Sequence, residues 1–362
     1  MKRMILVILA LLTGSVNADI ALEQLTLPAG FKIEFYAKNV ENARQMALSK
    51  SGVLYVGSRK AGKVYALLDE NKDGQAEKRW LVAEGLKLPS GIAWKDGNLY
   101  VAEVDKILIF PNIDKNLAAP KSEIFLSGLP KESHHGWKFL RFSPEGELVF
   151  PVGAPCNICE APTEKHARIF STNMKTKALT ELAKGVRNSV GFDFHPDSGE
   201  LWFSDNGRDM MGDDIPNCEI NRVVKKGAHF GFPYFHAGNI RDPEFGVGKI
   251  EQDYVAPALK LDAHVAPLGI HFYSGKQFPV SYKKQLFVAE HGSWNRSKKS
   301  GYKVGVITLE DSEVVKYEPF ITGFMQQEKT YGRPVAMLEL DDGSLLISDD
   351  YANVIYRVTY AR

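Results

Sequence analysis

The chain has 362 residues, with 45 lysine and arginine residues against 44 aspartate and glutamate residues, so its formal net charge is +1. A nearly neutral chain without an acidic or basic tail lacks the electrostatic footprint of a nucleic-acid-binding protein. The length exceeds that of a usual domain, but an all-β propeller holds a chain of this size as one unit. We therefore expect one domain and no nucleic-acid partner.

The first eighteen residues have the features of a secretory signal peptide. A basic pair precedes an apolar run at residues 4–12, and small residues stand before a cleavage site after Ala18. No later stretch has the roughly 18 continuous apolar residues of a membrane span. We expect a signal peptide at residues 1–18 and a mature periplasmic domain at residues 19–362, with no membrane span.

One pattern repeats along the mature chain: two short runs of alternating apolar residues, joined by a turn rich in Asp, Gly or Asn. Each such pair predicts a β-hairpin. Repeats of roughly 45–80 residues with four short strands each are typical of propeller blades. The sequence therefore predicts an all-β fold, a six-bladed β-propeller. The six copies cover residues 45–67, 90–110, 138–154, 188–207, 268–292 and 334–358.

The segment at residues 31–36 also has the composition of a strand and precedes the first copy. Pairing of this N-terminal strand with the C-terminal strand of the last blade would close the ring and remove an exposed sheet edge. We expect that closure. The two longest interruptions, residues 111–137 and 233–267, are expected to be loops over one face, where propellers carry their sites.

Charged and polar residues stand at the entrance of several predicted strands. Arg187 and Asn188 stand at the start of the fourth copy, His135 precedes the third, and His264 and Arg333 precede the fifth and sixth. Equivalent positions of neighbouring blades converge on the central channel. Histidine can accept a proton from a substrate hydroxyl near neutral pH, and arginine binds anions. The alternative for each residue is a packing clamp between blades.

A loop rich in Asp, Asn and Gly covers residues 205–214, directly after the fourth copy. Hard cations prefer oxygen ligands from carboxylates and backbone carbonyls. Arginine beside such a loop indicates an anionic ligand that also chelates metal. A second acidic stretch, residues 69–74, resembles the opening of a calcium loop, but Trp80 at its twelfth position excludes an EF-hand. A solvated hairpin turn is the favoured interpretation there, and a peripheral structural Ca²⁺ is the alternative.

The three cysteines are few for a disulfide scaffold. In an exported protein, Cys156 and Cys159 can close a small loop. A c-type haem motif would need histidine where Glu160 stands, and the further ligands for a zinc site are poor. We expect Cys156 and Cys159 to be oxidised together and Cys218 to be free, with a bridge to Cys218 as the alternative.

Several motifs together resemble a known family, the soluble glucose/sorbosone dehydrogenase-like proteins, and most closely its sorbosone dehydrogenase-like branch. The motifs are GVRNSVGFDFHP at 185–196, DNGRD, EIN and GFP within 205–233, HVAPLGIHFYSG at 264–275 and LFVAEHGSWNR at 286–296. Family members are six-bladed propellers that use pyrroloquinoline quinone (PQQ) with Ca²⁺. The resemblance covers nearly the whole mature chain. It implies an oxidoreductase that oxidises a sugar or aldehyde and passes electrons to a separate cytochrome- or quinone-linked acceptor.

The resemblance also assigns roles at the cofactor. His135 falls on the family's catalytic base, because it lies nine residues before the turn at 144–146. Arg187 and Asn188 match the pair that contacts the quinone, and Arg333 matches an arginine that binds a cofactor carboxylate. Arg187 is also expected to stabilise the charge that develops on the quinone oxygen. We expect Arg187→Lys to lower turnover and to leave thermal stability nearly intact.

The resemblance implies a calcium site in the 205–214 loop. Gly207 and Arg208 fall where two backbone carbonyls bind the ion and contact the cofactor. Asn206 is a nearby candidate for the cofactor, and Asp214 is a nearby candidate for the metal.

Four positions differ from the glucose-oxidising members of that family. Ala154 stands where a carboxylate orients the histidine, and Ser90 stands where a glutamine contacts the substrate. A family lysine aligns near His291, and Tyr331 replaces a second arginine. These differences keep two other classes open: a Ca²⁺-dependent propeller hydrolase such as a lactonase, and a non-catalytic binding propeller.

Overall fold

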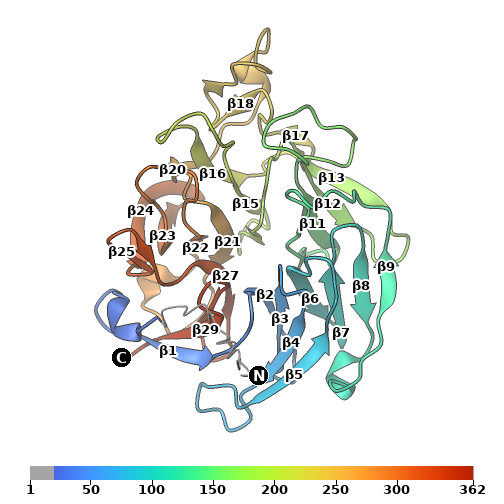
Figure 1. Ribbon diagram of the computed structural model, residues 1–362, viewed down its shortest axis with the longest axis vertical. Coiled ribbons are helices and arrows are strands. Elements are labelled where there is room, and N and C mark those ends of the chain that lie inside the picture. Colours follow the sequence, from blue (N-terminus) through green and yellow to red (C-terminus); the bar gives the residue numbers. More distant parts are fainter. Residues whose placement is uncertain (1–19, 362) are drawn as a thin grey trace, which may run out of the picture.

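The computed structural model describes residues 20–361, which form a six-bladed β-propeller around a central channel (Figure 1). The all-β class and the number of blades are confirmed. The expected signal peptide, residues 1–18, lies outside the described residues. Between residues 20 and 361, no helix has the length and apolar character needed to cross a bilayer. Helical structure in this part of the chain consists of 3-10 helices at Leu22–Gln24, Ile113–Lys115, Glu251–Asp253 and Val280–Tyr282.

The first three blades each begin with the strand nearest the channel and add strands outward. Blade one contains β2 (Ala43–Leu48), β3 (Leu54–Ser58), β4 (Val64–Leu68) and β5 (Lys78–Ala83). Blade two contains β6 (Gly91–Lys95), β7 (Asn98–Ala102), β8 (Ile107–Phe110) and β9 (Glu123–Leu126). Blade three contains β10 (Arg141–Phe142), β11 (Leu148–Val152), β12 (Arg168–Thr172), β13 (Leu179–Lys184) and the added strand β17 (Ala228–His229).

The other three blades repeat this order, and two short hairpins lie outside them. Blade four contains β14 (Phe192–Phe194), β15 (Leu201–Asp205), β16 (Asn217–Arg222) and β20 (Leu259–Ala263). Blade five contains β21 (Pro267–Phe272), β22 (Leu286–Glu290), β23 (Lys303–Glu310) and β24 (Glu313–Ile321). Blade six contains β27 (Pro334–Glu339), β28 (Leu345–Asp349), β29 (Val354–Tyr360) and β1 (Phe31–Ala37). The hairpins are β18 (Phe235–His236) with β19 (Ile240–Arg241), and β25 (Met325–Gln326) with β26 (Lys329–Thr330).

The ring closes as expected, because β1 pairs antiparallel with β29 from Phe31 opposite Tyr360 to Ala37 opposite Ile355. Strand β1 is thus the outermost strand of blade six, although it comes from the other end of the chain. The pairing satisfies an edge that would otherwise present free backbone groups to solvent.

The two long interruptions are only partly loops, so that expectation was wrong in part. The segment at 111–137 contains β9, and the segment at 233–267 contains β20, because each blade needs a fourth, outer strand. The acidic stretch at 69–74 is the turn between β4 and β5, as the hairpin interpretation predicts. Its Asp69 carboxylate accepts hydrogen bonds from the backbone N–H groups of Asp73 (3.1 Å) and Gly74 (2.8 Å).

The core lies between the blades, where the face of each sheet packs on its neighbours. In five of the blades, the second strand is buried at every position: β3, β11, β15, β22 and β28. Strands covered on both faces are apolar along most of their length rather than alternating, and the charged residues here come at the strand end, as Asp205 does in β15. The loops at the strand ends are therefore carried by a rigid scaffold.

Phe31→Ala tests the ring closure. The Phe31 ring packs edge-on against Phe278 at 4.8 Å and Phe320 at 4.9 Å between centroids. Its removal should lower the free energy of unfolding by roughly 2–4 kcal/mol, which denaturant unfolding would measure. Glu34→Ala, an exposed position of the same strand, is the control and should change stability by less than about 0.5 kcal/mol. Equal effects of the two substitutions would contradict a closure that depends on this ring.

Candidate active site

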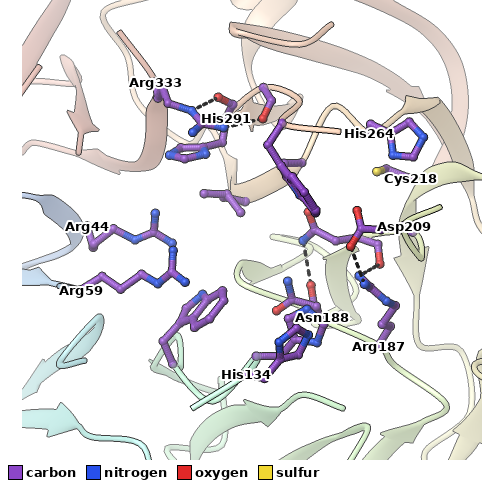
Figure 2. Close-up of a pocket in the computed structure, with 18 of the residues that line it drawn as sticks. Arg44, Arg59, His134, Arg187, Asn188, Asp209, Cys218, His264, His291 and Arg333 are labelled. Atoms are coloured by element: carbon purple, nitrogen blue, oxygen red, sulfur yellow. Dashed lines mark hydrogen bonds and ion pairs between the residues drawn. The ribbon is translucent and has the colours of Figure 1, made fainter. Parts of the chain in front are cut away.

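A cavity of about 540 Å³ lies where the innermost strands begin, at one end of the channel (Figure 2). The structure brings six of the predicted site residues to its wall, together with His264. Residues of blades one, four, five and six, or of the loops next to their strands, contribute, together with the loop between the second and third blades. The predicted residues at the wall are His135, Arg187, Asn188, Asn206, Gly207 and Arg333, and others are Arg44, Arg59, His134, Trp137, Asp209, Cys218, His291 and Trp294.

His135 is buried and has the geometry of a neutral base. Its Nδ1 lies 2.9 Å from the carbonyl oxygen of Ala154. Because a carbonyl only accepts, Nδ1 must carry the proton and Nε2 must keep its lone pair. Burial, and then the positive charge of Arg187, hold the pKa of His135 well below its ordinary value. The backbone of Ala154 thus orients the ring, in place of the carboxylate that the sequence lacks.

The chain packs closely around His135. A side chain at Gly153 would place its Cβ 2.6 Å from the Cβ of His135, so only glycine fits there. The loop that carries His135 is held by Lys138, whose buried Nζ donates to the carbonyls of Val104 and Gly136, both at 2.8 Å. Burial lowers the pKa of Lys138 to about 7. These contacts fix the base on its loop.

Arg187 is almost fully buried, with most of its donors bound within the protein. Asn157 accepts from Nε through its carbonyl and from Nη2 through its side chain, both at 2.8 Å. Nη2 also lies 3.1 Å from the Asp209 carboxylate, and Nη1 donates to the Asn206 carbonyl at 3.1 Å. One N–H of Nη1 is left for a ligand. Arg187 is therefore both a wall of the cavity and a clamp between two loops.

One of these loops is closed by the disulfide between Cys156 and Cys159, whose Cα atoms are 6.1 Å apart. The expected pairing is confirmed, and Cys218 is free and buried. Asn157 lies inside the disulfide loop, so the bridge holds the residue that grips Arg187. Burial raises the pKa of the Cys218 thiol to about 11.

The backbone at Arg187 and Asn188 is fixed by a buried carboxylate, Asp205. Its two oxygens accept from the N–H groups of Arg187 (2.8 Å) and Asn188 (2.6 Å). Burial raises the pKa of Asp205 to about 6. Asn206 donates to the carbonyl of Asn188 at 2.8 Å. Within residues 20–361, the side-chain amide of Asn188 has no hydrogen-bond partner, and it borders the cavity.

Arg333 reaches the cavity from blade six. Its Nε and Nη2 donate to the carbonyls of His291 (2.9 Å) and Gly292 (2.6 Å). Its guanidinium is therefore oriented by neutral groups, and no carboxylate of the described chain pairs with it. The structure thus presents a fixed positive charge that is not neutralised by an ion pair.

Two cavity arginines were missed by the sequence analysis, both from blade one. Arg44 is 2 % exposed, donates to Asp350 at 2.7 Å and contacts the Ser90 hydroxyl at 3.4 Å. Arg59 stacks on the indole ring of Trp137, 3.6 Å from its centroid. A signal for Arg44 exists, because it stands at the start of the innermost strand β2, much as Arg187 and Arg333 stand shortly before theirs.

Two predicted residues, Arg208 and Asp214, are not among the residues that line the cavity. The prediction for Arg208 concerned its backbone carbonyl, so it stays a prediction. The side chain of Arg208 turns away and pairs with Asp242, which also accepts from His236 at 2.9 Å. Asp214 is exposed and pairs with Arg296 at 2.6 Å. Asp214 lies apart because the segment after Arg208 folds outward toward the loop of blade five. Over the described residues, no three Asp, Glu, His or Cys side chains group as a metal site.

Fold and cavity define the class: a six-bladed propeller with a histidine and several arginines at one end of its channel. The chain belongs to the family described as "Domain of unknown function (DUF7133)", whose model matches residues 17–359. It is also 39 % identical to a protein of Borreliella burgdorferi described as "Uncharacterized protein". The aligned region of 368 residues covers 96 % of this chain and 94 % of the relative.

Solved structures share the fold at low identity. The calcium structure of a Trichoderma reesei Carbohydrate-Active Enzymes Family AA12 protein has a TM-score of 0.81 and 19 % identity, over 96 % of this chain and 100 % of that one. The PQQ domain of a Coprinopsis cinerea pyranose dehydrogenase has a TM-score of 0.77 and 18 % identity, over 92 % of this chain and 97 % of that one. The Escherichia coli soluble aldose sugar dehydrogenase has a TM-score of 0.70 and 16 % identity, over 91 % of this chain and 100 % of that one. At these identities the likeness establishes the architecture, and the sorbosone dehydrogenase-like branch stays a prediction.

Arg187→Lys should lower stability, contrary to what we expect from the sequence. Lysine cannot reproduce the fork that binds Asn157, Asp209 and Asn206. The loss of buried, charge-assisted hydrogen bonds should cost about 2–4 kcal/mol, seen as a lower melting temperature. Arg296→Lys, at a surface ion pair, is the control and should melt close to the wild type. An unchanged melting temperature for Arg187→Lys would contradict the clamp.

Proposed function

We propose that this protein is a periplasmic, PQQ-dependent dehydrogenase that oxidises a sugar or a related aldehyde. The observation that carries the proposal is the meeting of Arg187, Arg333 and the unprotonated Nε2 of His135 in one channel cavity. The shared fold with the PQQ domain of a pyranose dehydrogenase supports it. The periplasmic location rests on the signal-like residues 1–18.

The residues of the cavity fit PQQ, which carries three carboxylates. Arg333 donates only to neutral carbonyls through its side chain, so its charge is available to a cofactor carboxylate. Arg187 keeps one free N–H, and the amide of Asn188 can donate beside it. These three residues would hold the cofactor.

The same wall fits Ca²⁺ less well. Gly207 lines the cavity and can offer its carbonyl, but Arg208 and Asp214 do not line it. Asp209 is the carboxylate at the wall, and it already pairs with Arg187. We therefore assign no step to calcium and treat its requirement as a question for experiment.

When bound, PQQ supplies a quinone that accepts a hydride from the substrate. The chain's own part begins with His135, whose Nε2 accepts the proton of the substrate hydroxyl as that hydride leaves. The Ala154 carbonyl keeps Nε2 aimed into the cavity by holding Nδ1. The buried charge of Arg187 favours negative charge on its side of the cavity. Because its guanidinium is already held by hydrogen bonds, little reorganisation of the side chain is needed when that charge develops. A separate electron acceptor would be the partner of such a dehydrogenase.

Reconstitution tests the proposed cofactor. Purified protein would be titrated with PQQ in a calorimeter, with Ca²⁺ or with a chelator, and dye reduction followed with a panel of aldoses. We expect one PQQ per chain and at least about tenfold weaker binding for Arg333→Gln, because a charge-assisted contact is lost. Arg241→Gln, on the outlying β18–β19 hairpin, is the control.

Absence of PQQ binding under both conditions would overturn the proposal. Lactone hydrolysis without PQQ would instead favour the hydrolase class. PQQ-independent sugar binding without turnover under any acceptor would favour the binding propeller.

The pH profile tests the base. Since the neutral form of His135 is active and its pKa is lowered, kcat/KM should stay high as the pH falls through 6.5 and decline only below that. His135→Gln should lower kcat by roughly 10²–10⁴-fold and leave PQQ binding and the melting temperature nearly unchanged. An acid limb centred above pH 6.5, or full turnover in His135→Gln, would exclude this role.

A further inference from the structure

We propose that Arg59, with Arg44 beside it, binds an anionic group of the substrate, so that the substrate is an acidic sugar bearing a carboxylate or a phosphate. As a statement about the substrate, this rests on the proposed function. Figure 2 shows the two arginines side by side on one wall of the cavity, across from Arg187 and Asp209.

The guanidinium of Arg59 lacks a partner within residues 20–361. Its Nε is buried without a hydrogen bond, and so is the indole Nε1 of Trp137, on which it stacks. Burial, and then the positive charge of Arg44, lower the pKa of Arg59 to about 10, so it stays charged at neutral pH. A desolvated cation without an anion is costly. The terminal nitrogens of Arg59 also have no hydrogen-bond or ion-pair partner in the described chain, and an anion bound to them would compensate the charge.

Arg44 differs from Arg59 because it has a counterion. Its Nη1 binds Asp350 at 2.7 Å, and Asp350 also binds Nε2 of His291 at 2.7 Å. Arg44 is therefore fixed and neutralised, while Arg59 keeps its full charge. The wall has one unbalanced positive charge and the remaining donors of two guanidinium forks, which matches a single carboxylate or phosphate group.

The position of Arg59 favours the substrate over the cofactor as its partner. Trp137 lies two residues after His135 on the same loop, and their ring centroids are 6.0 Å apart. The reacting hydroxyl must lie at Nε2 of His135. Arg59 stacks on Trp137, so one indole ring separates the base from the cation. A monosaccharide whose hydroxyl meets His135 can place an acidic substituent at Arg59.

Binding to the full mature protein without PQQ tests the inference directly. Calorimetry would compare glucose with glucuronate and glucose 6-phosphate, and the two charged sugars separate a carboxylate from a phosphate preference. We expect at least one charged sugar to bind about tenfold or more tightly than glucose, and added salt to reduce the difference. Arg59→Gln should abolish the preference, and Arg59→Lys, which keeps the charge, should retain part of it. Arg296→Gln is the control.

The outcomes are distinguishable from failure of the proposed function. If Arg59→Gln weakens PQQ binding and leaves the preference for charged sugars unchanged, Arg59 serves the cofactor and the inference is wrong. Acetate or inorganic phosphate binding as tightly as the charged sugars would also overturn it. If PQQ does not bind but charged sugars still bind through Arg59, the anion site stands and the dehydrogenase proposal fails. In reconstituted enzyme, Arg59→Gln should raise KM for the acidic sugar and change kcat little.

Discussion

Pairing of β1 with β29 closes the ring, and the cavity at the end of the channel depends on that closure. In a closed ring, the innermost strands start around one axis, so residues far apart in sequence meet there. Arg44 and Arg333 are separated by most of the chain, yet both line the same cavity. Positive charges gathered in one cavity repel one another, which disfavours the folded state. The close apolar packing between blades holds the arginines in place against that repulsion.

The cavity arginines are held in different ways, and this decides what each can bind. Arg187 is clamped by loops and by Asp209, and Arg44 is paired with Asp350. Arg333 is oriented by carbonyls, and Arg59 by the face of an indole ring. Carbonyls and aromatic faces fix a guanidinium without cancelling its charge. The positive charge available to ligands therefore sits mainly on Arg333 and Arg59, on separate blades.

The sequence predicts the fold and part of the site because both follow local patterns. Hairpin repeats mark the blades, and polar residues at strand entrances locate Arg187 and His135. Arg59 escapes such reasoning, since its role arises from stacking on Trp137, a contact between blades. Asp214 belongs to a loop with the composition of a metal site, but it is exposed and pairs with Arg296. Ala154 stands where the family has a carboxylate that orients the histidine. In the structure the backbone carbonyl of Ala154 orients His135 instead. A comparison of side-chain types along the sequence cannot reveal such a backbone contact.

The charges that attract an anion also act on the base. Burial first, then the positive charge of Arg187 and, more weakly, that of Arg59, hold the pKa of His135 well below its ordinary value. An anion at Arg59 would offset part of that positive field and move the pKa of His135 back toward its ordinary value. The ring would then be a stronger proton acceptor with a charged ligand bound than in the free protein. In such a site, recognition of a negative substrate and activation of the base have the same electrostatic origin.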